Sequence, residues 1–306
     1  MATAKTDHLE RTAAEPRDKS LHTVTLAEIT EVNDQIRLFR LELSAPIHFL
    51  PGQWLDVYVP GVAKAGGYTI TSPPSSALTD ASSTPFLELA VQKSPDPPAA
   101  WLWQDPAAIT YADLRVRVGG GFVWPPPGVN ARALRKVVFV AGGVGVNPLV
   151  SMLSGLAEMR ERDRAFEVRF LYSLKDEAEE DGEGGAGTRR ARRLLFVERL
   201  AAVFASGRVR GSLQLFLTGG AGEGDGEVEG EGVVSCGSEG GDVRFRRRRM
   251  TVDDVAAAAG DSSERRFAVV YVCGVPTMTD EFVQKLSDPK HGFGMEPHRV
   301  LCEKWW

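Results

Sequence analysis

The strongest chemical pattern in this sequence of 306 residues is a glycine-rich turn, FVAGGVGVNPL, at residues 139–149. The order G-x-G-x-x-P is met by Gly143, Gly145 and Pro148. Glycines let the backbone turn sharply and approach a phosphate closely. Proline suits the first turn of a helix, whose free N–H groups and positive dipole end attract anions. No GK[ST] follows, so the turn favours a dinucleotide over ATP, with a ligand-free strand–helix turn as the alternative.

A second glycine turn, YVCGVPTMTDEF, occupies residues 271–282. Cys273 and Gly274 end an apolar run, and Pro276 opens a helical pattern. The strand–Gly–Pro–helix order of the first turn is therefore repeated. Taken alone, Cys273 is interpreted as a small buried hydrophobic residue.

Two kinds of element must position these turns. From residue 136 onward, five apolar runs of strand length alternate with helical patterns, which predicts a five-stranded parallel sheet covered on both faces. These runs are KVVFVA, EVRFLYS, LQLFLT, AVVYVCG and RVLCEKWW. Residues 21–130 instead show short alternating segments broken by Pro and Gly, which predicts a small antiparallel β-barrel. We therefore expect a barrel domain over 21–130 and an α/β domain over 131–306, with a short proline-opened helix in PPAAWLWQ.

Three segments are expected to stand outside these cores. Residues 1–20 are polar and predicted to be disordered, and residues 176–190 and 219–249 are predicted to be disordered insertions. Glycines and acidic residues dominate the longer insertion, so Cys236 within it is expected to be an exposed thiol. The four arginines at 246–249 could bind an anion or RNA, but a solvated run attracted to the preceding acids is the preferred interpretation.

Composition excludes several classes of function. With 36 basic and 41 acidic residues the net charge is -5, which predicts no nucleic-acid or anionic-membrane partner. Three cysteines without a CxxC indicate a reducing compartment and no four-cysteine iron–sulfur site. The five histidines form no cluster with metal-ligand spacing, so no metal site is expected. No apolar run reaches the length of a transmembrane span.

A barrel, then GGVGVNP, then CGVPTM, then a terminal EKWW, in this order, resembles the ferredoxin–NADP reductase superfamily. The resemblance implies FAD on a flavin-binding barrel and NAD(P)H on an NAD-binding domain of the ferredoxin reductase type. It implies a flavin-dependent oxidoreductase that takes hydride from NAD(P)H and passes electrons to an acceptor that the sequence does not identify. The oligomeric state is not identified either.

The flavin motif of that superfamily, R-x-Y-[S/T], matches residues 66–69. The resemblance implies that Tyr68 lies against the flavin and that the Thr69 hydroxyl donates to its N5 edge. Thr71 is placed among the flavin contacts in the same way.

Gly66 departs from the motif, because the superfamily has an arginine there that grips the flavin phosphates. A bidentate arginine–phosphate pair is therefore lost. The helix start near Ala99 could meet the pyrophosphate instead, and Lys93 could add charge. If neither compensates, the alternative is a flavin-poor nucleotide-binding or regulatory protein without robust redox activity.

In the second domain the resemblance implies that Cys273 and Gly274 lie beside the nicotinamide and that Glu303 helps to position it. One of the two terminal tryptophans is implied to cover the flavin. The catalytic residues are thus predicted to be Thr69, Cys273 and Glu303. The dinucleotide contacts are predicted to include Gly142, Gly143, Val144, Gly145, Asn147, Pro148, Cys273, Gly274, Pro276 and Met278. The aromatic residues predicted to cover the flavin are Trp305 and Trp306.

The choice of nucleotide depends on residues 172–180, YSLKDEAEE. Ser173 and Lys175 could meet a 2′-phosphate, whereas Asp176, Glu177 and Glu179 would repel it and suit a ribose diol. The balance favours NADH. An intracellular protein is expected. The resemblance implies mitochondria, but the N-terminal segment carries acidic residues among its bases and does not resemble an acid-poor presequence, so a cytoplasmic location stays open.

Overall fold

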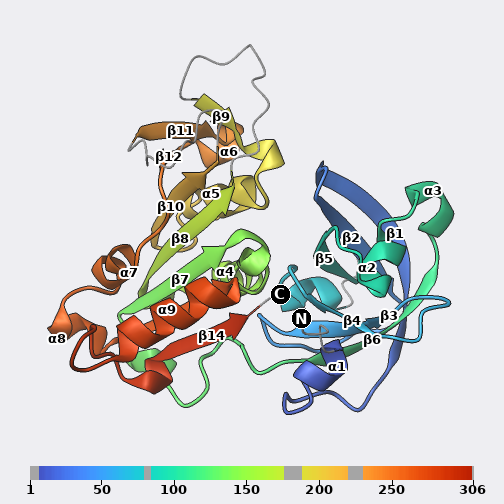
Figure 1. Ribbon diagram of the computed structural model, residues 1–306, viewed down its shortest axis with the longest axis horizontal. Helices are drawn as coiled ribbons and strands as arrows, with labels where there is room; N and C mark the ends of the chain where they lie inside the picture. The colour runs from blue at the N-terminus through green and yellow to red at the C-terminus, as the bar shows by residue number, and fades with distance from the viewer. Residues whose placement is uncertain (1–6, 79–83, 176–187, 220–229, 305–306) are drawn as a thin grey trace, which may run out of the picture. The chain divides into compact units, whose positions relative to one another are not determined.

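The computed structural model describes residues 7–78, 84–175, 188–219 and 230–304, with the backbone alone for 188–190. The chain forms two compact units, Met1–Trp124 and Pro125–Trp306 (Figure 1). The first is built on an antiparallel sheet and the second on a mostly parallel one, which confirms the predicted fold class.

The first unit is a six-stranded antiparallel barrel in the order β4-β3-β6-β1-β2-β5. Its strands are β1 (His22–Asn33), β2 (Ile36–Leu43), β3 (Trp54–Tyr58), β4 (Gly66–Thr69), β5 (Phe86–Gln92) and β6 (Asp113–Gly119). A bridge between Ile70 and Leu89 brings the chain after β4 onto β5 and closes the barrel. Alternate residues of β2, such as Phe39 and Leu41, are fully buried and fill the interior, as the alternating pattern predicts.

Short helices connect the barrel strands. They are η1 (Pro74–Ala77), α2 (Pro97–Leu102) and α3 (Pro106–Ile109). Each begins with proline, whose fixed φ and missing N–H are tolerated in a first helical turn. The helix expected in PPAAWLWQ is therefore confirmed as α2.

The prediction of a disordered segment over residues 1–20 is wrong from residue 7 onward. Helix α1 (His8–Arg11) is ordered, and His8 Nε2 donates a 2.9 Å hydrogen bond to Asp56 Oδ1. Arg17 and Arg117 bind Asp56 Oδ2 at 3.1 and 2.7 Å. Asp56 is fully buried in β3, so it needs these cationic and hydrogen-bonding partners, and the N-terminal segment supplies two of the three.

The second unit contains the five predicted parallel strands, in the order β14-β13-β7-β8-β10. They are β7 (Lys136–Gly142), β8 (Glu167–Lys175), β10 (Gly211–Thr218), β13 (Ala268–Gly274) and β14 (Val300–Lys304). The longer helices are α4 (Val146–Glu158), α5 (Val197–Ala205), α7 (Val252–Ala259) and α9 (Pro276–Ser287). The short ones are η2 (Ala131–Ala133), η3 (Gly143–Gly145), η4 (Glu161–Asp163), η5 (Ala191–Arg193), α8 (Ser262–Arg265) and η6 (Pro297–Arg299).

Both faces of this sheet are covered. Val255 of α7 and Phe282 and Leu286 of α9 pack on one face with Val140 and Val272 of the sheet. Helices α4 and α5 contact each other and pack on the opposite face, as right-handed crossovers between β7, β8 and β10 require. Continuous burial along β13 explains why its sequence is apolar without alternation.

The predicted disorder of residues 219–249 is wrong for the part of the insertion that the structure describes from 230 onward. Strands β11 (Glu231–Ser235) and β12 (Asp242–Arg246) form a hairpin around α6 (Gly237–Gly240), and β12 joins β10 in parallel. Strand β9 (Thr188–Arg190), within the other predicted insertion, pairs with β11 and completes an eight-stranded sheet. Val234 and Phe245 are buried by this pairing, which the glycine-rich composition concealed.

Two further expectations about this hairpin are corrected. Cys236 is only 5% exposed, and burial raises the pKa of its thiol to about 11, so it is not a reactive surface thiol. Arg246 and Arg248 bind Asp254 at 3.1 and 2.7 Å, so this part of the arginine run is anchored to α7. Within the described ranges, no helix is long and apolar enough to cross a bilayer.

Candidate functional site

The dinucleotide turn lies at the carboxyl end of β7, where open parallel sheets bind ligands. Strand β7 ends at Gly142, η3 makes a single tight turn, and α4 starts at Val146. Gly143 is exposed with a φ of +54°, and no atom lies within 4 Å of the position that a Cβ would take. The turn therefore leaves its backbone open to a ligand, as close approach to a phosphate requires.

The two predicted glycine turns pack directly against each other. A Cβ on Gly145 would lie 2.3 Å from the carbonyl oxygen of Cys273, and one on Gly274 would lie 3.3 Å from Cα of Gly142. The Met278 methyl lies over both Gly142 and Gly274, 3.0 and 2.5 Å from their Cβ positions. These glycines are thus required by packing, and the contact joins the carboxyl ends of β7 and β13 into one surface.

The other predicted nicotinamide residues lie at the same edge. Cys273 pairs with Glu303 in the register of β13 and β14, so the structure brings two of the three predicted catalytic residues together. Cys273 is fully buried, whereas Glu303 is half-buried. Lys304 binds Asp280 of α9 at 2.5 Å and fixes the end of β14.

Asn147 and Pro148 are buried in the first turn of α4, and Pro276 opens α9, as predicted. Trp305 and Trp306, predicted to cover the flavin, lie outside the described residues, as do Asp176, Glu177 and Glu179.

The flavin motif occupies β4 of the barrel and carries two buried hydroxyls. The Tyr68 ring packs against the barrel core, and burial of its hydroxyl, followed by the charge of Asp96, raises its pKa far above the ordinary value. Neither the Tyr68 hydroxyl nor the Thr69 hydroxyl has a hydrogen-bond partner among the described residues. A buried hydroxyl without a partner costs about 1–3 kcal/mol, which a bound polar ligand would recover.

Each hydroxyl can donate to or accept from a ligand, so both are compatible with the ring end of the FAD that the resemblance implies. The phosphate end does not fit. A Cβ at Gly66 would lie 2.6 Å from the Tyr68 ring, so the ring covers the position that lacks the arginine. Helix α2, expected to compensate near Ala99, starts with Pro97 and Pro98, which have no N–H to donate.

The two remaining barrel predictions are also located. The Thr71 hydroxyl lies 2.7 Å from Glu88 Oε1 and 3.1 Å from the Glu88 carbonyl oxygen, and its N–H donates to that oxygen at 2.8 Å. Thr71 thus helps to close the barrel, and its flavin contact stays a prediction. Lys93 places its ammonium 5.3 Å from the centroid of Trp103, a cation–π contact.

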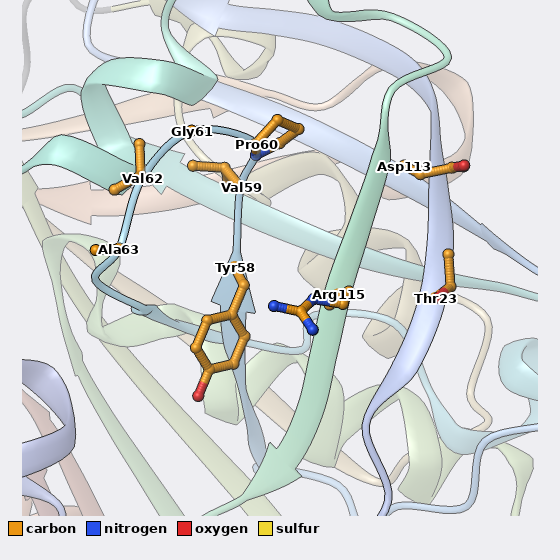
Figure 2. A pocket seen from close by; sticks show the side chains of 9 residues that line it. All are labelled: Thr23, Tyr58, Val59, Pro60, Gly61, Val62, Ala63, Asp113 and Arg115. Atoms are coloured by element: carbon orange, nitrogen blue, oxygen red, sulfur yellow. The ribbon is translucent and has the colours of Figure 1, made fainter.

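A hollow of about 680 Å³ lies on the barrel, beneath the loop between β3 and β4 (Figure 2). It is lined by residues 58–63 together with Thr23, Asp113 and Arg115. In Figure 2 the Arg115 side chain points toward Tyr58, and the guanidinium carbon lies 5.8 Å from that ring. None of the predicted flavin residues lines this hollow. In the described part of the chain, no three His, Cys, Asp or Glu side chains form a group that could hold a metal.

Sequence reasoning missed two features around the flavin motif. One is the Asp56 cluster, whose partner His8 fills the space opposite Gly67: a Cβ there would lie 2.1 Å from the imidazole. The other is Asp96, which directly precedes α2 and whose charge helps to raise the pKa of Tyr68, although an acid before two prolines is visible in the sequence.

Comparison with known proteins supports the two-domain fold. No protein-family model matches the chain. It is 30% identical over 311 residues to oxidoreductase NAD-binding domain-containing protein 1 of Bos taurus, covering 98% of this chain and 85% of that protein. A cytochrome P450 reductase structure from Amycolatopsis matches with a TM-score of 0.63 and 22% identity, over 95% of this chain and 70% of that one. A Neisseria gonorrhoeae ferredoxin NADP+ reductase with bound FAD and NADP matches with a TM-score of 0.59 and 14% identity, over 94% and 100%.

Proposed function

Because the chain belongs to the family of oxidoreductase NAD-binding domain-containing protein 1, we propose that it is an NAD(P)H-dependent oxidoreductase whose barrel binds a flavin. The α/β unit would bind the nicotinamide dinucleotide at its paired glycine turns. A flavin supplies hydride acceptance and later release of electrons, so the protein contributes binding, orientation and electrostatics.

The observation that carries the proposal is the pair of partnerless buried hydroxyls on β4. Tyr68 and Thr69 hold these hydroxyls where the superfamily motif meets flavin, and the described protein offers them no internal partner. If these side chains served packing alone, Phe in place of Tyr68 and Val in place of Thr69 would fill the same space without the cost of an unmet hydrogen bond. These two unmet hydrogen bonds support a polar ligand at the motif.

The residues of the α/β unit would orient the nicotinamide. The exposed turn at Gly143 meets the pyrophosphate, and the buried contact between Gly145 and Cys273 fixes the turn relative to β13. Glu303, beside Cys273 in the sheet, is the acid that would position the carboxamide of the nicotinamide. We propose NADH over NADPH on the acidic residues that follow β8, and comparing the KM values for both nucleotides tests this choice.

The test is anaerobic reduction of flavin. The purified protein is mixed with FAD and then with NADH or NADPH, and the visible flavin absorbance is followed. We expect absorbance to fall at a rate proportional to protein concentration. Flavin that binds but keeps its absorbance would indicate a nucleotide-binding or regulatory protein instead.

A further inference from the structure

The phosphate end of the flavin site differs from its ring end. Gly66 provides no side chain, and the Tyr68 ring occupies the adjoining space, within 2.6 Å of where a Cβ would stand. A cationic side chain at this position could enter only if Tyr68 moved. The strand therefore holds the ring of its own tyrosine where a phosphate ligand would be gripped.

Helix α2 offers little to an anion. Pro97 and Pro98 remove two of its first N–H groups, and the Ala100 N–H already donates to the Asp96 carbonyl at 2.8 Å. Ala99 alone remains among the first three helical residues with an N–H to offer, and it is buried. With six residues, α2 also has a short dipole.

Asp96 adds a negative charge at this place. It directly precedes α2, its side chain makes no capping bond, and its charge reaches the Tyr68 hydroxyl. The Asp96 carboxylate repels a phosphate but exerts no net electrostatic repulsion on an uncharged ring system. The site thus distinguishes the two ends of a flavin by charge.

We propose that flavin is an exchangeable substrate of this protein, recognised through its ring and ribityl chain, so that uncharged riboflavin binds as well as FAD. This inference rests on the proposed function. NAD(P)H gives one hydride, carrying two electrons, to flavin N5, and the flavin takes one further proton from water. NAD(P)+ and dihydroflavin then leave. Free dihydroflavin carries the electrons away, so the final acceptor need not dock on the protein.

The test is a fluorescence titration of the full-length protein with riboflavin, FMN and FAD. We expect riboflavin to bind as tightly as FMN and FAD or up to about fivefold more tightly, because no phosphate contact strengthens the binding of the two phosphorylated flavins and Asp96 repels their phosphates. Asp96→Asn should tighten FMN and FAD about fivefold and leave riboflavin unchanged, since it removes one like charge near the phosphate. Asp34→Asn, the same charge change at an exposed barrel residue, should change none of them.

Three outcomes would overturn the inference. FAD binding more than about tenfold tighter than riboflavin, or purification with one FAD per chain, would show that the protein binds the flavin phosphates. NAD(P)H would still reduce the flavin of such a protein, so the proposed function would stand. Equal changes of the FMN and FAD dissociation constants in Asp96→Asn and Asp34→Asn would show that Asp96 does not act on the phosphates. Failure to bind any flavin would contradict the proposed function together with this inference. Thermal melts check that each variant is folded. The comparison of riboflavin with FAD on the wild-type protein tests the inference even if a variant fails to fold.

Discussion

The turns that would contact phosphate in the two units differ in backbone access, in local charge and in the length of the helix that follows. In the α/β unit, Gly143 leaves an open backbone before α4, a helix of 13 residues. In the barrel, Asp96 and two prolines precede α2, a helix of six residues, and Tyr68 covers Gly66. Under the proposed function, the difference means that both ligand sites are kept while only the site in the α/β unit retains features that favour a phosphate.

The supports behind the two turns differ as well. The dinucleotide turn is held by backbone contact between Gly145 and Cys273. The flavin strand β4 is backed by a buried charge cluster, in which the N-terminal residue His8 lies against Gly67 and binds Asp56. One support is a steric contact between two backbone segments, and the other is a network of charges and hydrogen bonds around a buried carboxylate.

The largest effect is expected from removing the charge of the barrel cluster. Asp56→Asn leaves Arg17 and Arg117 without their counterion and should lower the free energy of unfolding by about 3 kcal/mol. Chemical denaturation measures the loss. A stability equal to wild type would show that the N-terminal segment is not held by this cluster.

The same cluster predicts a pH dependence. Burial opposes ionisation of Asp56, but the bonds from His8, Arg117 and Arg17 outweigh it and hold its pKa below the ordinary value. The stabilisation is therefore complete at neutral pH and is lost as pH falls through that lowered pKa, below about 4. Melting temperatures of wild type should fall more steeply with acid than those of Asp56→Asn, and parallel curves would contradict the assignment.

A smaller loss of stability is expected at the dinucleotide turn. Gly145→Ala forces a methyl group against the Cys273 carbonyl, which cannot move without shifting β13. It should cost about 2 kcal/mol and weaken NAD(P)H binding at least tenfold. Gly143→Ala is the matched control, because its Cβ meets open space and only its φ of +54° opposes the change, at about 1 kcal/mol. Equal losses in both variants would show that packing does not decide the turn.

The flavin motif predicts changes of opposite sign. Tyr68→Phe removes a buried hydroxyl that lacks a partner in the described protein, so the ligand-free variant should be as stable as wild type or about 1 kcal/mol more stable. Flavin should bind about fivefold more weakly, because the ligand loses that hydrogen bond. Melting curves and riboflavin titration measure the two effects. Lost stability with unchanged flavin affinity would make the hydroxyl structural.

The smallest effect is expected at Cys273. Its side chain is fully buried, so Cys273→Ala tests whether the thiol acts on nicotinamide or only fills space. If packing dominates, the rate of flavin reduction should change less than about threefold, while stability falls by about 1 kcal/mol. A rate loss above tenfold at unchanged NAD(P)H affinity would support the catalytic role that the superfamily resemblance implies.

Local patterns made the fold and the dinucleotide turn predictable from sequence. The spacing of Gly143, Gly145 and Pro148 and the apolar run before it are sufficient, because a tight strand–helix turn needs those residue types in that order. The flavin strand was found through the resemblance of residues 66–69, although Tyr68 alone is an ordinary strand aromatic.

Features made by residues far apart in the sequence could not be predicted. Asp56 binds Arg117 across 61 positions and His8 across 48, and no spacing rule connects them. The hairpin of β11 and β12 was hidden because few residues, such as Val234 and Phe245, bury its apolar surface among many glycines. The burial of apolar surface that follows from pairing with β10 can be seen only in the folded sheet.

The reaction that we propose is the transfer of hydride from a nicotinamide to a flavin. The most direct measurement is the anaerobic rate of riboflavin reduction by NADH, compared with NADH deuterated at C4 on the transferred face. The account predicts loss of flavin absorbance in proportion to protein concentration, and a slower rate with the deuterated nucleotide. Riboflavin and FAD that both keep their absorbance in the presence of protein and either nucleotide would contradict hydride transfer to a flavin.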